Sequence, residues 1–136
     1  MKRLPFVLNT GLGLWLLLAM SPTILANSWA EVRSVSTGPP AAIGEAANGC
    51  LAGAASLPPQ GEGFVQLRRE RLLQFGHPLT LSFVRDLGAS QTQASGRYVM
   101  IGDLSQPRGG LMSASHRSHQ NGLDLDIWFQ LADSPP

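Results

Sequence analysis

The sequence predicts an α+β domain in which a small, mainly antiparallel β-sheet packs against one helix. Residues 123–131 alternate strictly between apolar and polar side chains, which is typical of a strand with one buried face. Residues 98–101 form a short aromatic and aliphatic run, which indicates a buried strand. The segment that begins at Pro78 has apolar residues at helical spacing, and the 136 residues of the chain suffice for one domain at most.

The first 30 residues have the layout of a secretory signal peptide. Lys2 and Arg3 form a basic start, and an apolar run over residues 12–20 follows. The small-x-small rule favours cleavage after Ala30, which leaves residues 31–136 as the mature domain; the alternative sites are Ala26 and Ser28. An uncleaved anchor is the competing interpretation, but the apolar run is short for a bilayer span of about 20 residues. We therefore expect an exported protein with no membrane span after cleavage.

The charge balance limits the classes of partner. Removal of Lys2 and Arg3 leaves eight basic residues against nine acidic ones. No basic surface is implied, so nucleic acid is not an expected partner.

A single cysteine, Cys50, stands in a chain that is expected to be exported. Exported compartments favour disulfides, and an odd cysteine indicates a partner elsewhere. Cys50 is either a small buried apolar residue or one half of a disulfide whose partner lies outside this sequence.

The mature part begins with a Ser-, Thr-, Pro- and Gly-rich segment, residues 31–44, which is typical of a mobile lead-in. A first short strand is expected at residues 64–67. The charged run at residues 68–71 follows it, and we expect a solvated face there, with a binding role as the alternative.

The helix is predicted to begin at Pro78, because proline fits the first helical turn at no cost in hydrogen bonds. It ends at Gly88 or continues to about Gln93. Leu81 falls off the apolar face, and His77 is expected to cap or pack rather than to contact a ligand. The side chains expected to face the sheet are Leu79, Phe83, Val84 and Leu87.

Residues 101–131 contain the chemistry of the chain. Asn121-Gly122 is a strong turn signal, and the alternating strand follows it. Its odd positions are expected to form core. Its even positions carry two carboxylates and an indole, from Asp124, Asp126 and Trp128.

Two histidines three residues apart, followed by carboxylates just past a turn, suggest a metal site. Imidazole nitrogen and carboxylate oxygen both suit zinc. The turn brings His119 toward the polar face of the next strand, where Asp126 lies, and His116 or Asp124 are further candidate ligands. The competing interpretations are solvated histidines beside a strand with one polar face, or a Ser-His-Asp hydrolase using one of the serines at positions 113, 115 and 118, although no G-x-S-x-G elbow supports the latter.

The segment around these residues, Ser118-His119-Gln120-Asn121-Gly122-Leu123-Asp124-Leu125-Asp126-Ile127, resembles the zinc motif of the penicillin-insensitive murein endopeptidase family. That family belongs to the LAS-type zinc metallopeptidases, whose signature is a His, six residues and an Asp. Further landmarks appear in the expected order, so the resemblance covers roughly residues 42–131. They are Ala42-Ile43-Gly44, the run from Asn48 to Gly53, Leu57-Pro58, Gly76-His77-Pro78, Gly102-Asp103 and the run from Gln106 to Gly110.

The resemblance implies a truncated LAS-type fold and a periplasmic zinc endopeptidase. It implies that His119 and Asp126 hold the catalytic zinc, with His116 lining the site or serving a second metal position. The implied substrate is peptidoglycan, cut at its D-alanyl to meso-diaminopimelyl cross-bridges.

The sequence departs from the family after the zinc motif. The family's third ligand and its catalytic histidine come from a His-x-His further along, and no histidine follows His119 here. No catalytic base is therefore assigned, and we expect little or no endopeptidase activity from these residues alone. The alternatives are a non-catalytic exported protein that binds peptidoglycan through a degenerate metal site, and a small exported domain whose histidines are incidental.

Overall fold

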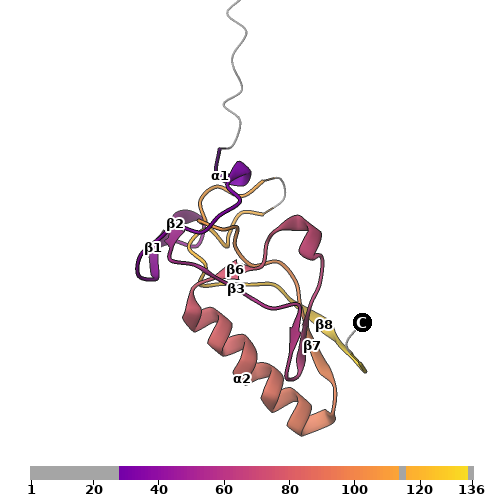
Figure 1. Cartoon of the computed structure of the whole chain (residues 1–136). Helices are drawn as coiled ribbons and strands as arrows, with labels where there is room; N and C mark the ends of the chain where they lie inside the picture. The colour runs from indigo at the N-terminus through magenta and orange to yellow at the C-terminus, as the bar shows by residue number, and fades with distance from the viewer. Residues whose placement is uncertain (1–27, 114–115, 135–136) are drawn as a thin grey trace, which may run out of the picture.

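The computed structural model describes residues 28–113 and 116–134, so the predicted signal peptide lies almost entirely outside the described residues. Within these ranges, no helix has the length and apolarity needed to cross a bilayer. The elements, in chain order (Figure 1), are α1 Ser28–Glu31, β1 Ala41–Glu45, β2 Asn48–Ala52, β3 Ala55–Ser56, β4 Gln60–Gly61, β5 Phe64–Gln66, the 3-10 helix η1 Arg69–Arg71, β6 Phe75–Gly76, α2 Pro78–Ser95, β7 Tyr98–Ile101 and β8 Ile127–Ala132.

The main sheet has four strands in the order β4-β5-β7-β8. Its β4–β5 and β7–β8 pairs are antiparallel, whereas β5 and β7 run parallel. Two further antiparallel pairs, β1–β2 and β3–β6, complete the strands of the described residues. The prediction of an α+β fold with a mainly antiparallel sheet and a packed helix is confirmed. β1 begins at Ala41, inside the segment that we expected to be a lead-in.

Helix α2 packs against β3, β5 and β7 and closes the core, and Figure 1 shows it on the opposite side of the molecule from α1. It begins at Pro78, as predicted, and the His77 side chain caps it by accepting a hydrogen bond from the Leu79 backbone at 3.2 Å. It runs past Gly88 to Ser95, where Gly96 ends it in a left-handed conformation. The core consists of Leu57, Phe64, Leu81, Val84, Val99, Ile101 and Leu104.

The predicted apolar face of this helix is confirmed in part: Val84 is buried and Leu87 packs against the core. Leu79 and Phe83 are exposed, whereas Leu81 is fully buried. The buried positions of α2 are Thr80, Leu81, Val84 and Gly88. Gly88 decides this orientation, because a Cβ there would lie 2.4 Å from the carbonyl oxygen of Glu62. Helix α2 therefore lies closest to the segment before β5 at a position where the helix has a small residue.

The last strand is also shorter and more exposed than predicted. β8 begins at Ile127 instead of Leu123, and Ile127 and Phe129 are exposed although they were expected in the core. Val99 pairs with Leu131 and Ile101 with Ile127, so three residues of β8 bulge opposite one residue of β7. The bulge interrupts the alternation of faces. Of the predicted core positions, Leu125 and Leu131 do pack against the core.

The short helix α1 lies within the predicted signal region and is part of the folded structure. The Trp29 ring packs on Gly110 so closely that a Cβ there would lie 2.2 Å from Trp29 Cδ2. This contact favours signal cleavage after Ala26 or Ser28, which keep Trp29, over the Ala30 site that the small-x-small rule selects. We therefore expect N-terminal sequencing of the exported protein to find a mature chain that contains Trp29. A mature chain that starts at Glu31 would contradict this.

Candidate metal centre

The site is built at one edge of the sheet, where β5 and β7 end. Gln66 pairs with Ile101 in the parallel register, so the two residues after each strand leave the sheet side by side. Arg68 and Asp103 occupy these equivalent positions. Asp126, just before β8, joins the same edge: its N–H donates to the Asp103 carbonyl at 2.9 Å, and its carbonyl accepts from the Gly102 N–H at 2.8 Å.

Asp103 is the buried electrostatic centre of this edge. Its side chain is 1% exposed, and its Oδ2 lies 2.6 Å from Arg71 Nη1, 2.9 Å from His116 Nε2 and 3.4 Å from Arg68 Nη2. None of these contacts is aligned as a hydrogen bond, so the two guanidinium groups attract the carboxylate mainly through their charge. A buried carboxylate needs such compensation, because burial of an isolated charge is strongly unfavourable.

Three of the candidate ligands converge next to this centre. His116, His119 and Asp126 each offer one ligand atom, and these atoms lie within 4.8 Å of one another. The two imidazole rings are 5.2 Å apart, centroid to centroid. The structure therefore brings together the three residues that the sequence analysis named, whereas the further candidate Asp124 stands outside the group and contacts His119 from another side.

One pair of these ligand atoms has a separation that suits zinc. His119 Nε2 and Asp126 Oδ1 are 3.5 Å apart. Two ligand atoms about 2.1 Å from a tetrahedral zinc ion are roughly 3.4 Å apart. The donor set of imidazole nitrogen and carboxylate oxygen is one that zinc accepts. We therefore regard His116, His119 and Asp126 as fitting a zinc ion.

The loop that carries His119 is held by the β1–β2 hairpin. The Gln120 N–H donates to the Ala46 carbonyl at 2.9 Å, and its side-chain amide donates to the Ala47 carbonyl at 2.9 Å. The Asn121 side-chain amide donates to the Gly44 carbonyl at 3.1 Å. Both side chains are buried, so their hydrogen bonds are needed to offset the loss of water. This anchoring fixes the backbone next to His119.

The other end of the same loop is tied to the start of α2. The Gly122 carbonyl accepts from the His77 N–H at 3.0 Å and from the Thr80 hydroxyl at 2.7 Å. His77 thus has the capping role that we predicted and supports the site through its backbone.

The hydrolase alternative gains nothing from the structure. Ser115 lies outside the described residues. Among those that are described, neither Ser113 nor Ser118 makes a hydrogen bond to a histidine.

The charged run after β5, which we expected to be a solvated face, contains no buried residue, but three of its side chains make specific contacts. Arg68 and Arg71 turn to Asp103, while Arg69 donates to the Leu57 carbonyl at 2.8 Å. Arg68 also lies 5.6 Å above the Trp128 ring, which is within cation–π range. The sequence signal for these contacts was the three-residue spacing of Arg68 and Arg71. The parallel pairing of β5 and β7, which brings both side chains to Asp103, was not predicted.

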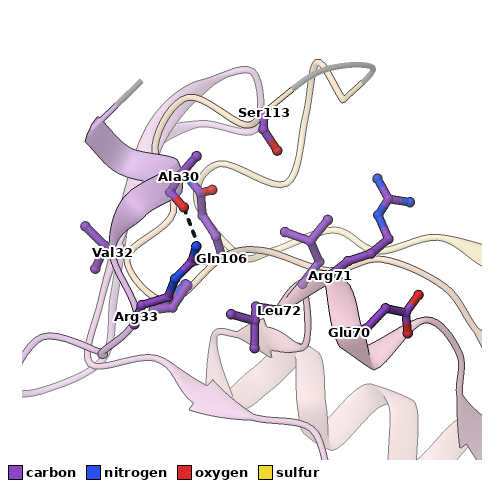
Figure 2. A pocket seen from close by; sticks show the side chains of 10 residues that line it. Ala30, Val32, Arg33, Glu70, Arg71, Leu72, Gln106 and Ser113 are labelled. Atoms are coloured by element: carbon purple, nitrogen blue, oxygen red, sulfur yellow. Dashed lines mark hydrogen bonds between the residues drawn. The ribbon is translucent and has the colours of Figure 1, made fainter. Parts of the chain in front are cut away.

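A cavity of about 340 Å³ adjoins this cluster on the side of α1. Figure 2 shows Arg33 bonded to the Ala30 carbonyl on one side and Arg71 extending away from it on the other. None of His116, His119 and Asp126 lines this cavity. The candidate metal centre is therefore a separate place, which shares only the Arg71 side chain with the cavity wall.

Comparison with known proteins identifies relatives of the chain. A family model described as penicillin-insensitive murein endopeptidase matches residues 42–136. The chain is 41% identical over 119 residues to a protein of that name from Yersinia enterocolitica serotype O:8, covering 88% of this chain and 43% of the relative. It is 38% identical to the corresponding protein of Escherichia coli O17:K52:H18, covering 90% of this chain and 45% of the relative.

The chain thus spans less than half the length of these curated relatives. The family match nevertheless includes all three converging residues and extends over most of the chain. The chain belongs to the penicillin-insensitive murein endopeptidase family, of which it spans the N-terminal part.

Proposed function

We propose that this chain supplies zinc ligands to an endopeptidase that cleaves D-alanyl to meso-diaminopimelyl cross-bridges of peptidoglycan in the periplasm. The observation that carries the proposal is the convergence of His116, His119 and Asp126 on one point of the sheet edge. Family membership supports the peptidase class and the peptidoglycan substrate. When bound, the ion would polarise the scissile carbonyl and acidify a water molecule.

The protein's own residues hold and orient the site. Asp103 and Arg71 fix the Nε2 side of His116, with Nε2 2.9 Å from the carboxylate and 3.2 Å from the guanidinium. The hairpin contacts fix the backbone beside His119. Asp126 is held through its main chain to Gly102 and Asp103. A site that is held in place before the substrate arrives loses little free energy in reorganisation.

The described part of the chain offers no histidine that could act as a base beside the three candidate ligands. His77 is engaged as the cap of α2, and His116 and His119 belong to the ligand group itself. We therefore propose that the 136-residue polypeptide alone releases little or no soluble product from peptidoglycan.

A chimaera tests whether this site serves an endopeptidase. The part of the Yersinia enterocolitica relative that follows the matched region is joined to this chain, and release of soluble muropeptides from purified sacculi is measured. We expect chelator-sensitive release by the chimaera and none by the chimaera with His119→Ala. Equal release by both would contradict the proposal.

The second candidate is a non-catalytic protein that binds peptidoglycan. The lack of a free histidine base within the described residues favours it. If this second candidate is correct, we expect the 136-residue polypeptide to co-sediment with sacculi. The chimaera is then expected to be folded and to contain zinc but to release no soluble muropeptides.

A further inference from the structure

Asp124 lies beside the candidate ligands, and its side chain contacts His119. Its two carboxylate oxygens accept from the His119 backbone N–H at 3.1 and 3.2 Å. Its Oδ2 also lies 2.8 Å from His119 Nδ1. A single carboxylate thus engages both the main chain and the ring of a residue whose side chain is 4% exposed.

The backbone of His119 is in an unfavourable conformation. Its φ is +67°, in the left-handed region, which is otherwise occupied mainly by glycines in this chain. A non-glycine residue is less stable there than in the right-handed region, because its Cβ lies too close to the carbonyl oxygen. The N–H of His119 would point into the turn without a partner if Asp124 did not accept from it. The carboxylate therefore compensates for this conformation at the residue where the metal ligand is needed.

The ring contact determines which nitrogen of His119 carries the proton. A negatively charged carboxylate oxygen 2.8 Å from Nδ1 repels the electron pair of an unprotonated Nδ1 and attracts the proton of an Nδ1–H. The proton is therefore favoured on Nδ1, although the ring N–H is not fully aligned with the oxygen. The lone pair of Nε2 is then free on the side of the ring that faces Asp126 Oδ1, 3.5 Å away.

The same geometry argues against Asp124 as a metal ligand. Its oxygens are occupied on the Nδ1 side of the imidazole, whereas the converging ligand atoms are those of His116, His119 and Asp126. Carboxylates that hold the second nitrogen of a ligating histidine fix its tautomer and raise its basicity.

We propose that Asp124 is the positioning residue of the metal centre: it holds His119 in the left-handed backbone conformation and keeps its proton on Nδ1, so that Nε2 is the ligand atom. This inference rests on the proposed metal site. Its first consequence, the tautomer, concerns the protein without any ion and can be tested separately.

The test compares Asp124→Asn and Asp124→Ala with Asp133→Asn. Asp133 is a suitable control because the same charge is removed from a side chain that is 87% exposed and paired only with Arg97. The first readout is the ¹⁵N spectrum of the His119 ring in the metal-free protein, at a pH where the imidazole is neutral. We expect the Nδ1–H tautomer in the parent and in Asp133→Asn, and a mixture with the Nε2–H tautomer in Asp124→Ala.

The second readout is zinc affinity, measured by competition with a chromophoric chelator. We expect Asp124→Ala to bind about 10- to 100-fold more weakly than the parent. Asp124→Asn, whose amide oxygen still accepts hydrogen bonds, is expected to lie between the two. An unchanged tautomer in Asp124→Ala, or zinc affinity within twofold of the parent, would overturn the positioning role. If the parent binds no zinc, the proposed metal site fails, whereas the tautomer result still decides the role of Asp124.

Discussion

Replacing Asp126 with alanine is expected to weaken zinc binding by about 100-fold. Zinc bound by a set of four ligands is stabilised by about 10–16 kcal/mol, so each ligand contributes roughly 3 kcal/mol. This corresponds to a factor of about 100 in the dissociation constant. Asp126 is itself partly exposed, so its removal takes no side chain out of the core, and the fold should be retained.

Isothermal titration of the purified polypeptide with zinc measures this effect. Asp133→Ala is the control, because it also removes a carboxylate near the end of the chain but none from the site. The account is contradicted if Asp126→Ala binds zinc as tightly as the parent, or if the control loses affinity to the same extent.

Replacing Asp103 with alanine is expected to destabilise the fold by about 3 kcal/mol. The loss of one partner from a buried ion pair typically costs about 3–5 kcal/mol. We expect the lower end of this range, because Arg68 and Arg71 are 40% and 31% exposed and can turn toward water. His116, which is 14% exposed, would lose its carboxylate partner as well.

Urea denaturation followed by circular dichroism measures this loss. Asp86→Ala is the matched control, since Asp86 is exposed on α2 and forms no ion pair with another described residue; its effect should stay within about 0.5 kcal/mol. A stability of Asp103→Ala equal to that of the control would show that the buried cluster does not stabilise the fold.

The sequence predicts best those elements whose signals are local. Pro78 at the first helical turn and the apolar run of β7 each depend on a few neighbouring residues. The helix start and the β7 strand were predicted for this reason. The orientation of α2 depends instead on the close approach of Gly88 to Gly63, where a Cβ on Gly63 would lie 1.8 Å from the Gly88 carbonyl oxygen. That contact joins residues 25 positions apart and leaves no mark on the helical pattern.

The exposed face of β8 has a similar explanation. Alternation predicts a buried face only when each residue has one partner across the ladder and a neighbour covers that face. The bulge opposite Met100 and the position of β8 at the sheet edge remove both conditions. Ile127 and Phe129 are exposed for these reasons.

The candidate site was predicted in part. His116, His119 and Asp126 lie within 11 residues of one another and are joined by a turn that the sequence signals clearly. Arg68 and Asp103 are 35 residues apart, and only the parallel register of β5 and β7 places them together. A parallel pair requires a long crossover, here through α2, and we had expected a mainly antiparallel sheet without identifying this pair.

We propose that zinc binds between His119 Nε2 and Asp126 Oδ1, with His116 nearby. Anomalous diffraction at the zinc absorption edge, from crystals of the protein grown with zinc, tests it most directly. We expect a peak about 2.0–2.2 Å from both atoms. A peak elsewhere, for example at Cys50, would contradict the proposed zinc site. So would the absence of a peak between His119 and Asp126 in crystals grown with zinc.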